Sequence, residues 1–165
     1  MLNLTKWKVI VGVLLLTIGS VSAETPNSFQ PGMKVCMSAG YILGLDDYAP
    51  DAISLMNVKI HYQFNPYFSL GGTAGGSMFY DMFKDDNTPG FINITTDAQG
   101  ILPVSKKVSL FGEVGFGVGI GISNIDTNYL LRVGPGIIMG PVALSALYNK
   151  FGEYEAMLFQ IGYRF

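Results

Sequence analysis

Apolar and polar residues alternate strictly along the last eleven residues of the chain, 155–165. Every second position counted back from the terminal Phe165 is apolar or aromatic, namely Tyr163, Ile161, Phe159 and Met157. A period of two places successive side chains on opposite faces of a β-strand. Such a stretch has about the length of a tilted strand that crosses a bilayer. The pattern therefore predicts a transmembrane strand with its apolar face toward lipid.

The same alternation recurs through the chain from residue 34 onward. It predicts eight strands, at 34–43, 53–65, 68–80, 91–102, 108–122, 129–139, 142–148 and 155–165. In the second of these, Val58 and Ile60 fall on an apolar face, whereas Lys59 and His61 fall on a polar face. A soluble barrel of the lipocalin type would need polar residues at Val58 and Ile60. The predicted fold class is all-β, an eight-stranded antiparallel up-and-down transmembrane β-barrel.

The connections between the predicted strands differ in length and charge. Those after the second, fourth and sixth strands are short, at 65–67, 103–107 and 140–141, and those after the first and third are longer and acidic. The connections after the fifth and seventh strands, 123–128 and 149–154, are also short, which weakens the contrast. Short turns on one rim and polar loops on the other are typical of outer-membrane barrels, whose turns are periplasmic.

A proline inside the sixth predicted strand conflicts with a regular ladder. Pro135 has no N–H group, and a closed barrel offers no free edge on which this loss would be harmless. We therefore expect a bulge or kink at Gly134-Pro135-Gly136.

The first 23 residues have the composition of a cleaved signal peptide, with Lys6 and Lys8 ahead of an apolar run and small residues up to Ala23. Residues 24–33 then form a short periplasmic arm, and residues 34–165 form the barrel. Beyond Ala23 the chain has 8 basic and 12 acidic residues, and this balance argues against a nucleic-acid partner. Cys36 is the only cysteine, so no internal disulfide is available, and we expect a buried, inert thiol that points inward.

The terminal Tyr163-Arg164-Phe165 and the alternation before it resemble the last strand of bacterial outer-membrane β-barrels. Residues 24–165 as a whole resemble the small eight-stranded barrels of the opacity-protein and outer membrane protein A type. This resemblance implies the outer membrane of a Gram-negative bacterium, delivery by periplasmic chaperones and insertion by the β-barrel assembly machinery. It also implies a monomer in contact with outer-membrane lipid and lipopolysaccharide. The expected assembly signal consists of Phe159, Ile161, Tyr163 and Phe165.

The predicted inward face carries nearly all the charges of the strands. We expect Lys59, Asp97, Glu113 and Arg132 to form a lumenal network of ion pairs, because unpaired buried charges are costly. The interior of an eight-stranded barrel is just wide enough to be filled by side chains. The charges therefore predict a plugged lumen, and the alternative is a narrow cation- or proton-conducting gap gated by Glu113.

Alternate glycines in the fifth predicted strand leave space on the inner wall. Gly115, Gly117, Gly119 and Gly121 are expected to make room for bulky inward residues such as Phe79 and Phe91. The alternative is that these six residues line a small apolar pocket open to the outside.

The sequence contains no catalytic motif that we recognise. His61 is the only histidine, and no Ser-His-acid spacing accompanies it, so we expect a hydrogen-bonded lumenal histidine. A single histidine also makes a poor metal site, and neither a cofactor nor a metal is expected. The preferred function is a non-enzymatic structural or surface barrel with a plugged lumen. The alternative is a narrow porin or a channel for small hydrophobic solutes.

Overall fold

The computed structural model describes residues 29–45, 51–79, 90–122 and 126–165. The expected signal peptide and most of the two acidic loops lie outside these residues. Eight strands follow one another in order: β1 (Gly32–Gly44), β2 (Ala52–Asn65), β3 (Phe68–Phe79), β4 (Gly90–Pro103), β5 (Val108–Ile122), β6 (Asn128–Met139), β7 (Val142–Phe151) and β8 (Tyr154–Arg164). Among the described residues, no helix is long and apolar enough to cross a bilayer.

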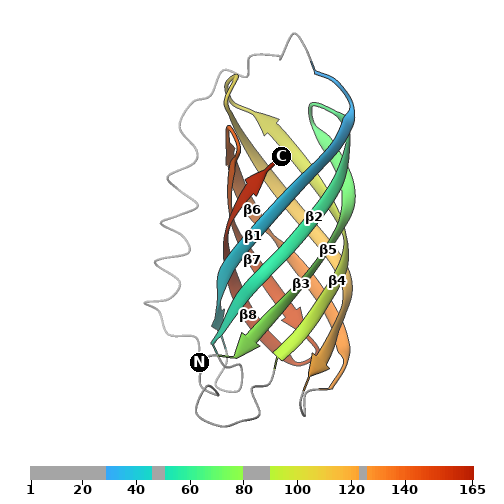
Figure 1. Cartoon of the computed structure of the whole chain (residues 1–165), viewed down its shortest axis with the longest axis vertical. Coiled ribbons are helices and arrows are strands. Elements are labelled where there is room, and N and C mark those ends of the chain that lie inside the picture. The colour runs from blue at the N-terminus through green and yellow to red at the C-terminus, as the bar shows by residue number, and fades with distance from the viewer. Residues whose placement is uncertain (1–28, 46–50, 80–89, 123–125) are drawn as a thin grey trace.

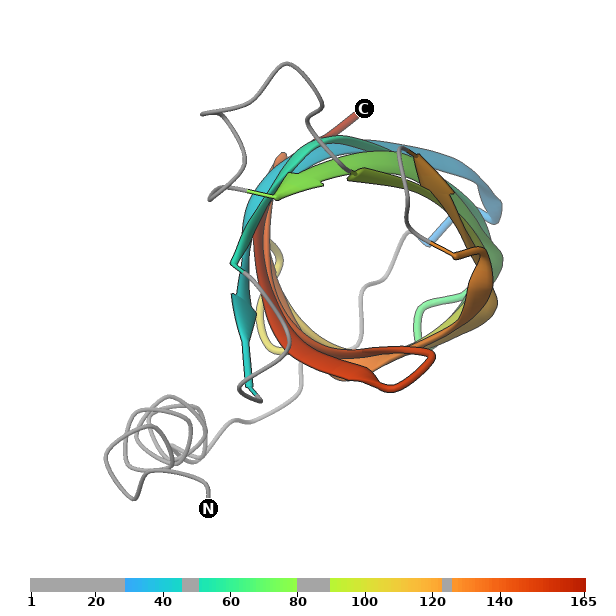
Figure 2. The ribbon, with the colours of Figure 1, turned by 90° about the horizontal axis from the view of Figure 1, so that it is seen from below.

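The strands form a closed antiparallel barrel. Each strand pairs with the next, and β8 pairs with β1 to close the ring. Figure 1 shows the strands tilted across the wall, and Figure 2 shows the ring viewed along its axis. The predicted fold class is therefore confirmed, and β7 extends three residues beyond the predicted end at Tyr148, to Phe151.

The two ends of the barrel differ in their connections. One end carries the β2–β3, β4–β5 and β6–β7 turns and the end of β8, and we call it the turn end (Figure 1, top). The opposite end, which we call the loop end, carries the β7–β8 hairpin. Gly140 in the β6–β7 turn and Gly152 in the β7–β8 hairpin have φ angles of 61° and 58°, a left-handed conformation that favours glycine.

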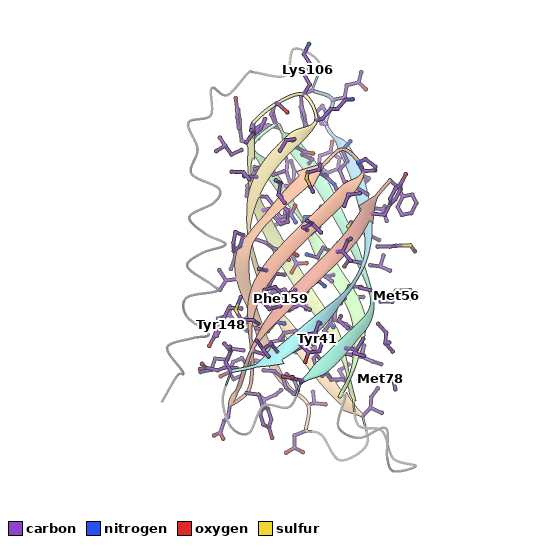
Figure 3. The ribbon with its side chains drawn as sticks, turned by 90° about the vertical axis from the view of Figure 1, so that its left-hand side faces the viewer. Tyr41, Met56, Met78, Lys106, Tyr148 and Phe159 are labelled. Atoms are coloured by element: carbon purple, nitrogen blue, oxygen red, sulfur yellow. The ribbon has the colours of Figure 1, made fainter. Side chains whose placement is uncertain are left out.

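The wall has its apolar side outside and its polar side inside. Among the described residues, 28 large apolar or aromatic side chains are exposed and only 10 apolar residues are buried. The buried set also contains sixteen polar or charged residues, such as Asn57 and Thr95. In a soluble protein so large an apolar surface would cause association, whereas in a bilayer it contacts lipid. Phe159 and Met56 lie on this outer wall (Figure 3).

Of the bulge or kink expected at Pro135, the bulge is absent. Against β5 the pairing runs unbroken through Gly112↔Pro135. Against β7, Val133↔Tyr148 and Gly136↔Ser145 keep one register, and only the pairs between them are absent from the ladder. The missing N–H therefore interrupts the β6–β7 ladder locally without adding a residue to either strand. The register instead shifts between Ser38 and Gly40, between Ser54 and Met56, and between Gln63 and Asn65.

Two apolar clusters lie inside the barrel, one toward each end. The loop-end cluster contains Ile42, Ala52, Phe91, Leu147 and Leu158, with Ala156 packed against it. The turn-end cluster contains Ile101, Phe111 and Ile138, with Ala143 packed against it. Burial of these side chains contributes roughly 1.5–3 kcal/mol for each large one. The polar interior therefore lies between two apolar layers.

Candidate functional site

The strongest polar contact in the interior joins β2 to β5. Lys59 Nζ lies 2.7 Å from both carboxylate oxygens of Glu113, and both side chains are buried. Gln99 on β4 donates a further hydrogen bond from Nε2 to Glu113 Oε2 at 2.8 Å. The alternation of β2, β4 and β5 turns these three side chains inward, and the curvature of the closed sheet brings them together. A buried carboxylate with two donors in hydrogen-bond range is well compensated.

Polar contacts continue from Gln99 toward the middle of the barrel. Ser69 Oγ donates to Gln99 Oε1 at 3.2 Å and lies 3.3 Å from His61 Nδ1. His61 Nε2 lies 3.7 Å from Asp97 Oδ2, which also accepts a hydrogen bond from Thr73 Oγ1. Together with Lys59 and Glu113, these residues form one continuous series of contacts through four strands. Many of the interior polar groups thus contact one another in place of solvent, although His61 Nε2 and Asp97 Oδ1 have no hydrogen-bond partner among the described residues.

Ser69, His61 and Asp97 make a Ser-His-acid juxtaposition that the sequence analysis did not foresee. Gly71 produces it, because this residue pairs with His61 on one side and with Asp97 on the other. Catalysis requires the serine hydroxyl to donate to the histidine, whereas Ser69 donates to Gln99. In addition, all three residues are at most 4% exposed. The arrangement therefore lacks access for a substrate at Ser69, although Ser69 Oγ lies 3.3 Å from His61 Nδ1.

Arg132 lies deep in the interior but is not part of the Lys59–Glu113 contact. Its Nε donates to Asn149 Oδ1 at 3.3 Å, and the residue is 1% exposed. Its Nη1 atom and Asp97 Oδ1 have no hydrogen-bond partner among the described residues. Of the four charges expected to form a network, Lys59 and Glu113 pair directly. The described residues show no ion pair from Arg132 to either carboxylate.

The glycine-rich wall of β5 faces inward and is covered by other side chains. A Cβ atom added at Gly119 would lie 2.3 Å from the ring of Phe151. That ring stacks on Phe91, with centroids 5.2 Å apart and planes at 12°. A Cβ atom at Gly115 would lie 2.2 Å from Asp97 Oδ1. Phe151 was missed because the sequence analysis placed it in a loop, and the side chain of Phe79 is outside the described residues.

The neighbours of the other two glycines differ. At Gly117 an added Cβ would meet the backbone of β4, 1.9 Å from the Ile94 oxygen. Gly121 pairs with Phe91 across the β4–β5 ladder. The space beside the glycines is thus used for close strand approach and for the rings of Phe91 and Phe151.

A cavity of about 40 Å³ lies in the half of the barrel nearer the turn end. Its lining includes Lys34, Cys36, Lys59 and Arg164, together with Phe111 of the turn-end cluster. Cys36 is half-buried here and borders open space, so it is less enclosed than the sequence analysis expected. No group of three potential metal ligands occurs among the residues that the structure describes.

The residues of the expected assembly signal lie on the outer wall. Phe159, Ile161, Tyr163 and Phe165 are 38–69% exposed. The rings of Tyr163 and Phe165 meet edge to face, with centroids 5.0 Å apart. Aromatic rings at the border of the hydrocarbon layer anchor outer-membrane barrels at the interface. Recognition of these residues by an assembly machinery remains a prediction.

The fold is similar to that of solved outer-membrane barrels. The N-terminal β-barrel domain of Pseudomonas aeruginosa OprF matches with a TM-score of 0.54 and 14% identity, over 82% of this chain and 100% of that one. Ail, the attachment invasion locus protein of Yersinia pestis, matches with a TM-score of 0.53 and 18% identity, over 82% of this chain and 97% of that one. No protein-family model and no curated protein sequence matches this chain.

The closed eight-stranded ring, its apolar outer wall and its polar interior define a small transmembrane β-barrel with the fold of these outer-membrane proteins. This fold agrees with the location predicted from the sequence, the outer membrane of a Gram-negative bacterium.

Proposed function

We propose that the protein is a non-enzymatic structural barrel of the outer membrane whose lumen is closed by its own side chains. The observation that carries this proposal is the loop-end cluster, which joins side chains from β1, β2, β4, β7 and β8 across the lumen. The turn-end cluster joins only the neighbouring strands β4, β5, β6 and β7. A solute crossing the barrel would have to displace the loop-end cluster.

The loop-end closure is the more extensive of the two. Leu147 and Leu158 are at most 1% exposed, and Phe91 stacks on Phe151 beside them. The stack lies over Gly119, in the half of the lumen where an apolar pocket was a possible alternative. Close packing of this kind resists rearrangement, because voids and displaced rotamers each cost free energy. This packing favours a plugged lumen rather than a channel for hydrophobic solutes.

The alternative function, a narrow ion channel, draws support from the middle of the barrel. Several polar atoms there lack partners among the described residues: Asn93 Oδ1, Thr95 Oγ1, Asp97 Oδ1 and Arg132 Nη1. Buried polar groups without protein partners are commonly satisfied by internal water. A chain of water molecules along these groups would conduct small ions if the side chains of the apolar clusters moved apart.

Single-channel recording in planar bilayers tests the closed lumen. Refolded protein comprising residues 24–165 should give no stable conductance steps, with folding verified by heat-modifiable gel mobility. The double substitution Phe91→Ala and Phe151→Ala should open the loop end and raise the frequency of steps. The outward substitution Ile92→Ala, on the same strand as Phe91, is the matched control and should leave the bilayer silent.

Two outcomes would contradict the closed lumen. Stable steps from the unmodified protein that change size or ion preference with Glu113→Gln would establish the channel. If the Phe91/Phe151 double variant also gave no conductance steps, these two rings would not form the barrier.

The remaining parts of the proposal concern biogenesis and surroundings. We propose that periplasmic chaperones and the β-barrel assembly machinery deliver the chain, and that it stays monomeric in contact with lipid and lipopolysaccharide. The exposed apolar wall supports the lipid contact. The terminal aromatic residues support recognition during assembly.

A further inference from the structure

We propose that the cavity near the turn end is a binding site for a small oxyanion of the sulfate, phosphate or carboxylate type. Of the thirteen described residues that line it, Lys34, Lys59 and Arg164 carry positive charge and none is Asp or Glu. Glu113, which pairs with the Lys59 ammonium, does not line the cavity. Low-dielectric walls strengthen the field of charges of one sign and concentrate counter-ions.

The sheet register brings the three cations around one point. Cys36 on β1 pairs with Lys59 on β2 and with Arg164 on β8. Lys34 lies two residues from Cys36 on β1, on the same inward face. Neither the Lys34 ammonium nor the Arg164 guanidinium has a hydrogen-bond or ion-pair partner among the described residues. An anion beside Cys36 would therefore give two uncompensated cations a partner.

Two buried polar groups reinforce this assignment. Ser38 Oγ and Gln160 Nε2 line the cavity and have no hydrogen-bond partner among the described residues, and the two residues are only 8% and 6% exposed. Gln160 already accepts a hydrogen bond at Oε1 from Ser145 Oγ, which leaves its amide N–H groups for another acceptor. Donors without acceptors are expensive to bury. An oxyanion supplies acceptor atoms for both groups.

The size of the cavity limits the ligand. A volume of about 40 Å³ corresponds to roughly three water molecules. This accommodates a single oxyanion group. Gly162 maintains the space, because an added Cβ would lie 2.8 Å from Cys36 Sγ and 2.9 Å from Ser38 Cβ. Lys34 and Arg164 stay partly exposed near the ends of β1 and β8, so the site communicates with the turn end.

Cys36 is a native reporter for this site, because it is the only thiol of the chain and lines the cavity. The experiment compares its modification rates with an anionic and a cationic methanethiosulfonate reagent in the refolded protein. The ratio of the two rates cancels differences in thiolate reactivity. We expect the anionic-to-cationic ratio to exceed that of the urea-unfolded protein by about tenfold, through electrostatic attraction. Sodium sulfate should slow modification more than sodium chloride at equal ionic strength.

Variants separate the site from general surface charge. Lys34→Gln and Arg164→Gln should each lower the rate ratio and weaken protection by sulfate. Lys106→Gln removes an exposed cation of the β4–β5 turn that does not line the cavity, and it is the matched control. A ratio equal to that of the unfolded chain, or equal responses of all three variants, would overturn the proposal.

A second readout covers the case in which Cys36 reacts with neither reagent. Sulfate should raise the urea midpoint of the native protein more than that of the Arg164→Gln variant. Equal shifts in the two proteins would also overturn the proposal.

The oxyanion could be free in the periplasm or part of a lipid headgroup. Protection of Cys36 by inorganic phosphate in zwitterionic detergent would indicate a soluble ligand. Protection in phosphatidylglycerol vesicles, but not in phosphatidylcholine vesicles or by phosphate, would indicate a headgroup. The anion site uses only the turn-end half of the lumen. The proposal of this site therefore does not depend on whether the loop end is closed.

Discussion

Lys59 and Glu113 are 54 residues apart in the sequence and meet in the interior, with Lys59 Nζ 2.7 Å from both carboxylate oxygens. The contact joins β2 to β5, which are not neighbours in the sheet. It therefore braces the ring from inside in a way that ladder hydrogen bonds between adjacent strands do not.

Glu113→Ala should destabilise the barrel by about 3 kcal/mol, because it leaves the Lys59 ammonium buried without its partner. Urea unfolding of the refolded protein in lipid bilayers measures the loss. The double substitution Lys59→Met and Glu113→Leu removes both charges and should lose much less. Equal losses in the single and double variants would show that the unpaired Lys59 ammonium is not the cause of the loss.

Phe159→Arg should strongly reduce insertion into the membrane. Phe159 lies at the middle of β8 on the outer wall, and an Arg on the lipid face at the bilayer midplane costs roughly 2–4 kcal/mol. The matched control is Met33→Arg, since Met33 is also outward but is the second residue of β1, where the cost falls to about 0–1 kcal/mol. The yield of each variant in the outer-membrane fraction distinguishes them. Similar yields would contradict the assignment of Phe159 to the middle of the lipid-facing wall.

Gly119→Ala should destabilise the loop-end closure by about 1–3 kcal/mol, because the new methyl group would meet the Phe151 ring. Gly112→Ala on the same strand is the control, as nothing lies within 4 Å of its added Cβ. Urea midpoints of the two refolded variants test the difference. If Gly119→Ala matched the control, the space beside Gly119 would be larger than the structure indicates.

The alternation of side chains was sufficient to predict the fold. A period of two assigns each strand residue to a face, and eight such strands with an apolar outward face leave few alternatives to a barrel. The errors lay where this signal is weak. The end of β7 was misplaced because Asn149 and Lys150 are polar residues that precede a glycine turn, although Phe151 continues the inward face. At Pro135 the prediction offered a bulge or a kink, and the structure shows no added residue but a local loss of ladder pairing.

The sequence by itself determined most of the inward positions, since alternation depends on local backbone geometry. It did not show the register shift between Ser54 and Met56, where Leu55 and Met56 are both exposed. Only the tertiary structure decided which of the inward residues meet, because the tilt and stagger of a closed sheet place side chains from different strands at one height. Closure brought Lys59 to Glu113, placed His61 between Ser69 and Asp97, and left Arg132 without a direct carboxylate partner in the described part of the chain. It also gathered Lys34, Lys59 and Arg164 around one cavity, a grouping that no spacing along the chain expresses.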